Sequence, residues 1–233
     1  MSVIFNSPTI RRGGIVKDGL VLNLDAADTF SYPRTGTRWN DLSGNGNHAT
    51  LVNSPSFSYN NDGYFIFNGT NNYVTLSNLI LNTTTGFTID LIVYIEDPQP
   101  VYSNFWSYWY ASGNGFEWGT YASGSNQGKF LFKDNSASGS PGISTTYIGN
   151  QWAIITFGCN NAIPFMYLNG NYQGVANTFR TNTNITLSRI FGSSTPLTTY
   201  YKCYSSGLKA YNRALSASEV SQNFEALRGR FGI

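Results

Sequence analysis

Residues 88–95, TIDLIVYI, are the most β-rich run of the chain and restrict its fold more than any other stretch. The run is apolar at both odd and even positions, and Asp90 is its one interruption. Because side chains alternate between the two faces of a strand, this pattern predicts a central strand covered on both faces. The buried charge of Asp90 then requires a partner or a route to solvent.

Turn residues separate further short runs that favour β-strands. The first, residues 20–24, ends at Asp25 and leads into a polar, Gly-rich loop that we expect Trp39 to anchor. Residues 68–72 separate two β-rich runs and are typical of a hairpin. Asn169 and Gly170 predict a tight type I′ hairpin turn.

One helix is predicted, over residues 217–228. Ser216 occupies the N-cap position, and Glu219 completes a capping box three residues later. Gly229 is the expected stop. The helix has one apolar stripe, which we expect to pack on the domain: Val220, Phe224 and Leu227.

Composition favours a single folded β domain. The chain has 233 residues, with 16% aromatic and 11% charged residues, which argues against disorder. A net charge of +2 without a large basic cluster makes nucleic acid a poor partner.

Cysteine use and hydropathy indicate folding in a reducing cytoplasm. Cys159 and Cys203 are expected to be buried thiols, although their spacing leaves a disulfide open. No apolar run at the start is long enough for a signal peptide, and we expect no membrane insertion.

Four stretches, in order, resemble laminin-G-like domains of the concanavalin A-like jelly-roll superfamily: residues 19–57, 67–74, 86–89 and 211–216. The resemblance covers residues 19–228. It implies an all-β fold, a two-sheet antiparallel jelly-roll sandwich with one short C-terminal helix. Residues 1–18 are then an N-terminal arm, docked on its own domain or on a neighbouring subunit, and residues 229–233 are a C-terminal tail.

The ending, residues 212–233, is similar to the ends of such domains in virion proteins of tailed bacteriophages, especially those of cyanobacteria. This resemblance implies a non-enzymatic virion structural protein that decorates or attaches to a capsid, neck or tail. It would reside in the virion, with other virion proteins and copies of itself as partners. Five apolar residues near the termini are the candidate assembly contacts: Ile4, Phe5, Ile10, Phe231 and Ile233.

A carbohydrate-binding adhesion module that recognises host-surface glycans is the alternative function. Residues 102–121 hold the highest concentration of aromatic residues. Trp and Tyr side chains suit a stacking platform for sugars or a subunit interface, but also a core face. The candidate sugar-binding residues are Trp106, Tyr108, Trp109, Tyr110 and Trp118.

Calcium is the one cofactor that the sequence suggests. Asp41, Ser43 and Asn45 repeat the alternating oxygen ligands of a calcium loop, and Asp25 and Asp28 lie nearby. Val52 stands where the twelfth-position acid is expected. The alternative is that these side chains satisfy backbone groups in Asx-type turns.

We expect no hydrolase activity. Catalytic members of the resembled superfamily carry acids at alternating strand positions, and no two acids here are separated by two positions. Glu117 would be a lone acid, whereas glycoside hydrolysis needs two carboxyl groups. His48, the single histidine, is expected to be structural or solvent-exposed rather than catalytic.

Overall fold

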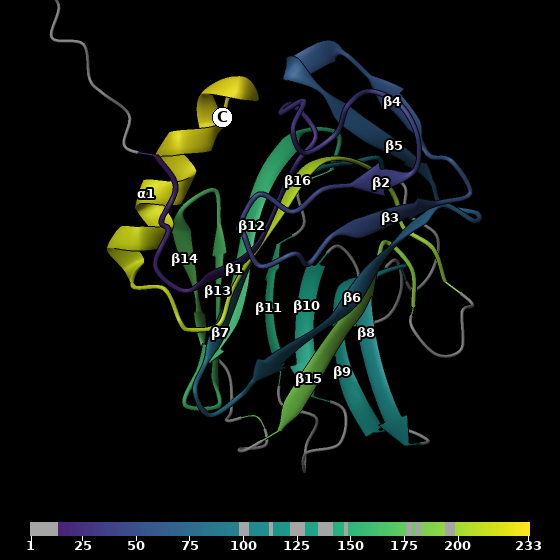
Figure 1. The fold of residues 1–233 in the computed structure, drawn as a ribbon. Helices are drawn as coiled ribbons and strands as arrows, with labels where there is room; N and C mark the ends of the chain where they lie inside the picture. Colours follow the sequence, from purple (N-terminus) through teal and green to yellow (C-terminus); the bar gives the residue numbers. More distant parts are fainter. Residues whose placement is uncertain are drawn as a thin grey trace, which may run out of the picture.

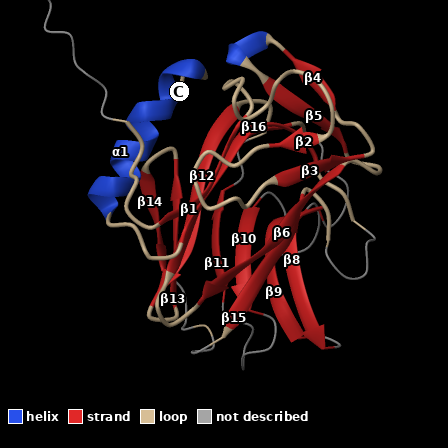
Figure 2. Ribbon diagram, viewed as in Figure 1, coloured by secondary structure: helices blue, strands red, loops and turns tan. Residues whose placement is uncertain are grey.

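The computed structural model describes residues 14–97, 103–111, 114–121, 129–134, 142–146, 149–175, 179, 183–193 and 199–233. Within some strands only the backbone is described. These residues form an antiparallel β-sandwich with one short helix near the C-terminus, as predicted (Figures 1 and 2).

The first layer is an eight-stranded sheet. Its consecutive neighbours are β14 (Asn171–Val175), β13 (Ile163–Leu168), β12 (Trp152–Asn160), β7 (Phe87–Ile95), β16 (Lys202–Tyr211), β5 (Tyr64–Asn68) and β4 (Ser56–Ser58). The eighth strand, β1 (Leu20–Asp25), also pairs with β16. β7 therefore lies in the middle of the sheet, which confirms the central strand predicted for residues 88–95.

The second layer consists of two four-stranded sheets. One has the order β11 (Gly142–Thr146), β10 (Lys129–Asp134), β9 (Asn114–Tyr121) and β8 (Ser103–Ala111). The other has the order β15 (Asn184–Ile190), β6 (Tyr73–Asn82), β3 (Ala49–Val52) and β2 (Arg38–Trp39). One buried core joins both layers. Trp39 belongs to it, 1% exposed and edge-on to Phe65, as its expected role as an anchor requires.

The hairpin predicted at residues 68–72 is wrong, because β5 and β6 belong to different layers. The turn itself forms. Asn68 Oδ1 accepts hydrogen bonds from the backbone N–H groups of Thr70, Asn71 and Asn72. These bonds satisfy the backbone N–H groups of the turn without a hairpin partner. The same residues can therefore connect a strand of one layer to a strand of the other. At Asn169 and Gly170 the predicted hairpin is confirmed, with positive φ at both residues and β13 paired with β14.

Helix α1 (Ala217–Leu227) covers part of the outer face of the eight-stranded sheet (Figure 1). The capping box of Ser216 and Glu219 is present, and a 3-10 turn, η3 (Arg228–Arg230), follows the helix. Val220 and Leu227 are buried as predicted, whereas Phe224 is half-buried beside the β13–β14 turn.

The described part of the N-terminal arm docks on its own domain. Val16 N donates to Asn223 Oδ1 on α1, and Tyr211 Oη donates to Val16 O. Gln222 Nε2 donates to Gly14 O. Residues 14–18 thus lie between the helix and the sheet.

A row of polar side chains crosses the sheet under α1. Asp90 accepts hydrogen bonds from Thr156 Oγ1 on β12 and from Asn223 Nδ2 on the helix, so its required partners exist. Lys209 lies opposite Asp90 on β16, and within the described residues its Nζ has no hydrogen-bond partner. Burial raises the pKa of Asp90 and lowers the pKa of Lys209.

Candidate functional site

The two described tryptophans of the predicted aromatic platform on β8 and β9 belong to the core. Trp106 is 2% exposed and Trp118 is 1% exposed, and Trp118 stacks on Phe105 and Phe157. Neither indole can therefore present a face to a sugar. The side chains of Tyr108, Trp109 and Tyr110 lie outside the described residues.

A register irregularity explains why this hairpin departs from simple alternation. The pairing of β8 with β9 shifts between Asn104 and Trp106, and both Phe105 and Trp106 are buried. A bulge of this kind turns consecutive side chains towards one side. Two consecutive aromatic residues of β8 can therefore both pack in the core.

In the candidate calcium loop, the carboxylate oxygens of Asp41 accept hydrogen bonds from the protein itself. Asp41 Oδ1 accepts from Asn23 N and Ser43 N, and Asp41 Oδ2 accepts from Ser43 Oγ and Asn47 N. Asn45 Nδ2 donates to Leu20 O. These contacts favour the Asx-type alternative, in which the carboxylate satisfies backbone donors.

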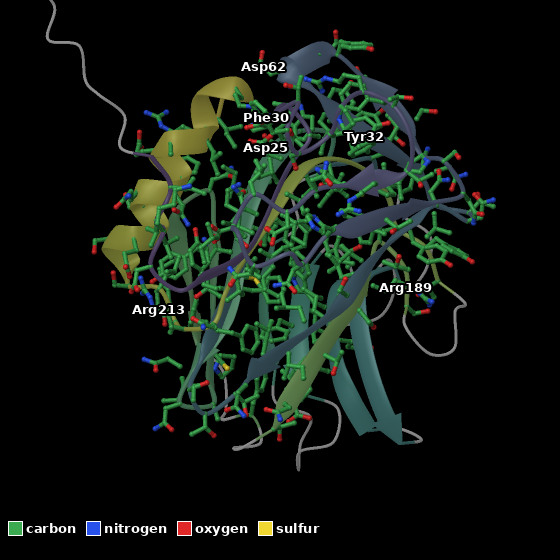
Figure 3. The ribbon with its side chains drawn as sticks, viewed as in Figure 1. Asp25, Phe30, Tyr32, Asp62, Arg189 and Arg213 are labelled. Atoms are coloured by element: carbon green, nitrogen blue, oxygen red, sulfur yellow. The ribbon has the colours of Figure 1, made fainter. Side chains whose placement is uncertain are left out.

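The other two candidate ligands are also occupied. Asp25 pairs with Arg230, whose Nη1 lies 3.0 Å from Asp25 Oδ1, and Asp28 Oδ1 accepts from Phe30 N. Figure 3 shows Asp25 near the far end of α1, and Arg213 at the beginning of the helix. No group of three metal-ligating His, Cys, Asp or Glu side chains occurs in the described part of the chain.

The C-terminal assembly residues pack on their own domain. Phe231 is 8% exposed, and its ring lies 4.6 Å from the ring of Trp152. Ile233 joins the same cluster as a partly buried residue. This packing corrects the expectation that Phe231 is available for assembly. Ile4, Phe5 and Ile10 lie outside the described residues.

The remaining reactive side chains have structural surroundings. His48 Nδ1 accepts a hydrogen bond from Asp41 N, so the imidazole helps to hold the loop. Cys159 and Cys203 are buried free thiols, and burial raises the pKa of Cys159 to about 12. Glu117 is buried in the core hairpin. None of the helices among the described residues has the length and hydropathy of a membrane span.

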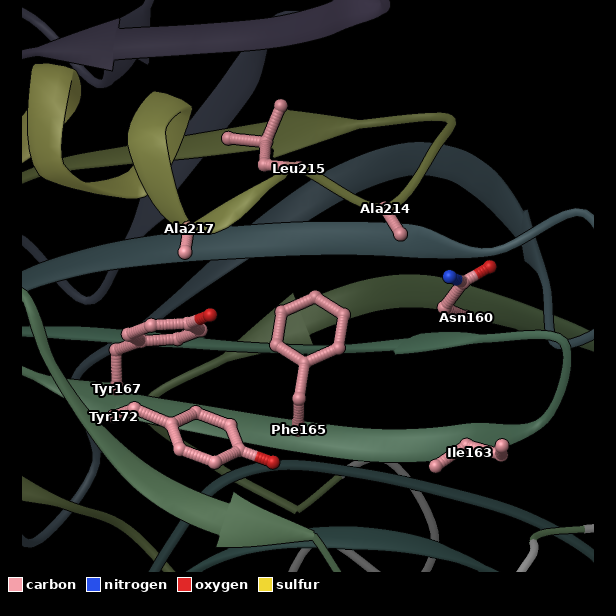
Figure 4. Close-up of a pocket in the computed structure, with 8 residues that line it drawn as sticks. All are labelled: Asn160, Ile163, Phe165, Tyr167, Tyr172, Ala214, Leu215 and Ala217. Carbon is pink, nitrogen blue, oxygen red and sulfur yellow. The ribbon is translucent and has the colours of Figure 1, made fainter.

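An open groove lies instead on the outer face of the eight-stranded sheet, beside the start of α1 (Figure 4). Its volume is about 490 Å³. One side is formed by the end of β12 and by the β13–β14 hairpin. The other side is formed by the connection from β16 to α1 and by the first residue of α1. The lining residues are Asn160, Ile163, Phe165, Tyr167, Tyr172, Ala214, Leu215 and Ala217.

Three aromatic rings from the hairpin line the groove. Phe165 and Tyr167 share one face of β13, with ring centres 6.0 Å apart. Tyr172, on β14, lies 5.2 Å from Tyr167 and is 54% exposed. The tight turn at Asn169 and Gly170 brings the two tyrosines together, and Phe224 packs against that turn.

The polar tips in the groove are free for a ligand. Among the described residues, none hydrogen-bonds the hydroxyl groups of Tyr167 and Tyr172 or the side-chain amide of Asn160. Burial, followed by the neighbouring Tyr172, raises the pKa of Tyr167. Its phenol therefore stays protonated at neutral pH and can donate as well as accept a hydrogen bond.

The side of the groove opposite the hairpin, which we call the facing wall, consists of residues 214–217 and is flanked by an ion pair. Arg213 precedes it and Glu219 follows it, and the two side chains form hydrogen bonds of 2.6 and 3.0 Å. Arg213 and Ser216 lower the pKa of Glu219 to about 2. This pair and the capping box bracket residues 214–217 and fix the shape of the wall. The hydrogen bonds of Thr88 on β7, which accepts from Leu215 N and donates to Arg213 O, hold the wall on the sheet.

Sequence reasoning did not identify this groove, although its signal was present. The type I′ turn was predicted, and Phe165 and Tyr167 have the spacing of one strand face. Ala214, Leu215 and Ala217 meet them only through the three-dimensional fold.

Comparisons with known proteins agree with the architecture. Domain 4 of AbnA, an extracellular GH43 arabinanase from Geobacillus stearothermophilus solved in complex with arabinotriose, aligns with a TM-score of 0.66 at 13% identity. The alignment covers 89% of this chain and 98% of that domain. At this identity the likeness shows the fold.

Botulinum neurotoxin binding regions align similarly. The serotype D binding domain gives a TM-score of 0.67 at 11% identity, covering 90% of this chain and 52% of the toxin chain. A type C toxin, whose cell entry is described as dependent on two ganglioside molecules, gives 0.66 at 13%, covering 91% and 52%. The chain thus spans about half the length of these toxin chains.

A search of curated proteins finds no match. The Laminin_G_3 family, described as the concanavalin A-like lectin/glucanases superfamily, matches residues 68–221. That segment is more than half of the chain and contains strands from all three sheets. The protein therefore belongs to the concanavalin A-like lectin/glucanases superfamily.

Proposed function

We propose that this protein is a non-enzymatic carbohydrate-binding module and that the groove between the β13–β14 hairpin and the start of α1 is its binding site. The observation that carries the proposal is the combination of three groove-lining rings with three polar side-chain ends that no described residue hydrogen-bonds. The rings belong to Phe165, Tyr167 and Tyr172, and the polar ends to Tyr167, Tyr172 and Asn160.

The chemistry of a sugar fits this combination. A pyranose ring has C–H groups that pack on aromatic surfaces, and hydroxyl groups that exchange hydrogen bonds with phenols and amides. Tyrosine offers both features in one side chain, with an apolar ring and a polar end. The volume of about 490 Å³ lies within the ordinary range for small-ligand pockets.

The same residues support the proposal that the groove binds its ligand without hydrolysing it. Glycoside hydrolysis ordinarily uses two carboxyl groups on either side of the scissile bond. None of the eight groove-lining residues is acidic. The nearby Glu219 is paired with Arg213 and caps the helix, so its carboxylate already has structural partners and is not placed as a catalytic acid.

A glycan array with the purified protein, followed by calorimetry on the glycans bound, tests the proposal. Tyr172→Ala should weaken binding at least tenfold, about 1.4 kcal/mol. Tyr59→Ala is the matched control, because Tyr59 is 73% exposed and does not line the groove. Binding of no glycan, or equal losses in the two variants, would contradict the proposal.

A virion structural role is the second candidate. The likeness of residues 212–233 to the ends of phage virion domains supports it, and a virion protein could display the groove to host glycans. Mass spectrometry of purified virions should detect the protein in stoichiometric amounts. Its confinement to the lysate supernatant would count against this role.

A further inference from the structure

Besides its aromatic rings, the groove has other features that restrict which sugars it can bind. This step rests on the proposed function, and it concerns the chemical class of sugar that the groove selects. Charge, the distribution of polar atoms and the nature of the facing wall each restrict that class.

Charge excludes an acidic sugar as the preferred ligand. The eight lining residues are all uncharged. The nearby guanidinium of Arg213 is paired with both Asp18 and Glu219, at 2.8 and 2.6 Å. A carboxylate in the groove would lose hydration without gaining a free cation, which is unfavourable.

The polar atoms of the groove lie on one side. Asn160, Tyr167 and Tyr172 all belong to β12–β14. The facing connection offers the methyl groups of Ala214 and Ala217, whereas the Leu215 side chain points away from the groove into a buried cluster with Val16 and Tyr211 (Figure 4).

Backbone groups of this connection are already used. Ala214 O accepts from Arg213 Nη1, and Leu215 N donates to Thr88 Oγ1. Ser216 N donates to Glu219 Oε2. A ligand hydroxyl pointed at this wall would therefore find few partners, whereas an apolar group would gain contact.

We propose that the groove selects a neutral sugar that bears a methyl group, with its hydroxyl groups towards the tyrosines and its methyl group against the wall of Ala214 and Ala217. Two sources supply this chemistry: the C-methyl group of a 6-deoxyhexose and the acetyl methyl group of an N-acetylhexosamine. The aromatic rings of the hairpin contact the sugar ring, and Ala214 and Ala217 contact the methyl substituent.

Matched sugar pairs test the inference. Methyl glycosides of L-rhamnose and L-mannose differ by one hydroxyl group, as do those of L-fucose and L-galactose. N-acetylglucosamine with glucose forms the third pair, and N-acetylneuraminic acid tests the effect of charge. Affinities come from NMR titration of the full chain, and saturation transfer shows which ligand protons contact the protein.

We expect the methyl-bearing member of at least one pair to bind about tenfold more tightly, since discrimination of one small group in an apolar pocket has that order. Its methyl protons should receive strong saturation. The pair that shows the preference identifies the source, 6-deoxy or N-acetyl.

Ala217→Ser provides a second measurement, because it adds a hydroxyl group to the wall at an exposed position. It should reduce the preference at least threefold. Ala226→Ser, the same change farther along α1, is the control and should leave the preference unchanged.

The outcomes separate this inference from the proposed function. Equal affinities within every pair, with binding still lost in Tyr172→Ala, would overturn the methyl selection and leave the glycan site in place. Tighter binding of N-acetylneuraminic acid than of every neutral sugar would also overturn it. No binding of any sugar, on the array or in solution, would overturn both.

Discussion

Two aromatic hairpins of this protein differ in where their side chains lie. The β8–β9 hairpin is the richer in aromatic residues, yet Trp106 and Trp118 are buried in the core between the layers. The β13–β14 hairpin is poorer, yet Tyr172 is 54% exposed and lines an open groove with Tyr167. Aromatic density therefore indicates where the layers pack, whereas a binding surface needs rings on the uncovered face of a sheet.

The largest expected effect belongs to the buried hairpin. Trp118→Ala should lower the free energy of unfolding by about 3–5 kcal/mol, because it removes a fully packed indole and leaves a cavity. Urea denaturation followed by circular dichroism measures the loss. A change below 1 kcal/mol would show that this hairpin is not part of the core. The difference between the β8–β9 and β13–β14 hairpins would then not hold.

The next effect concerns the contact that fixes α1, and with it one wall of the groove. Asn223→Leu keeps the approximate volume but leaves Asp90 Oδ2, Val16 N and Tyr211 Oη without the amide. We expect a loss of about 2–3 kcal/mol from unsatisfied buried groups. Gln222→Leu, at an exposed neighbouring position on α1, is the control and should cost much less.

Acid pH should weaken the same wall by a smaller amount. The pKa of Glu219 is about 2 in the folded protein, below its ordinary value of 4.5, because of Arg213 and Ser216. A lowered carboxyl pKa stabilises the fold above pH 4.5, and this contribution is lost as the pH falls from 4.5 towards 2. For this partly exposed pair we expect about 1 kcal/mol, because solvent screens the attraction.

Comparing the unfolding free energy of the wild type with that of Glu219→Gln between pH 7 and pH 2 measures this contribution. The two proteins should differ at neutral pH and converge in acid. A constant difference across the range would show that ionisation of Glu219 does not stabilise the wall.

The smallest effect on stability should come from the exposed hairpin. Tyr172→Ala should change the free energy of unfolding by no more than about 0.5 kcal/mol, since surface substitutions rarely do more. Thermal unfolding beside the wild type is a sufficient measurement. A loss of 2 kcal/mol would mean that Tyr172 has a packing role and would weaken its assignment to binding.

Locally determined features were predictable from the sequence. The capping box of Ser216 and Glu219 and the turn at Asn169 and Gly170 depend on residues a few positions apart, and both are confirmed. The strand over residues 88–95 was recognisable because its apolar pattern reports burial on both faces.

Long-range pairing was not predictable in the same way. The turn at residues 68–72 has hairpin chemistry, but which strands then pair is decided by the packing of the whole sandwich. Arg230 satisfies Asp25 from 205 positions away, so Asp25 looked available as a calcium ligand. Burial of Trp106 likewise depends on the opposite layer, which no local pattern reveals.

The position of β16 also affects how the chain can fold as it is synthesised. β16 is synthesised after the other described strands of this sandwich, yet it lies inside the eight-stranded sheet and pairs with β1, β5 and β7. Until it arrives, the nascent chain carries strands whose hydrogen-bonding edges are open, and such edges promote aggregation. Because β1 pairs with a strand from the opposite end of the domain, we expect slow folding that is completed only after translation has passed Tyr211. Chaperones that shield the early strands should then improve the yield of folded protein.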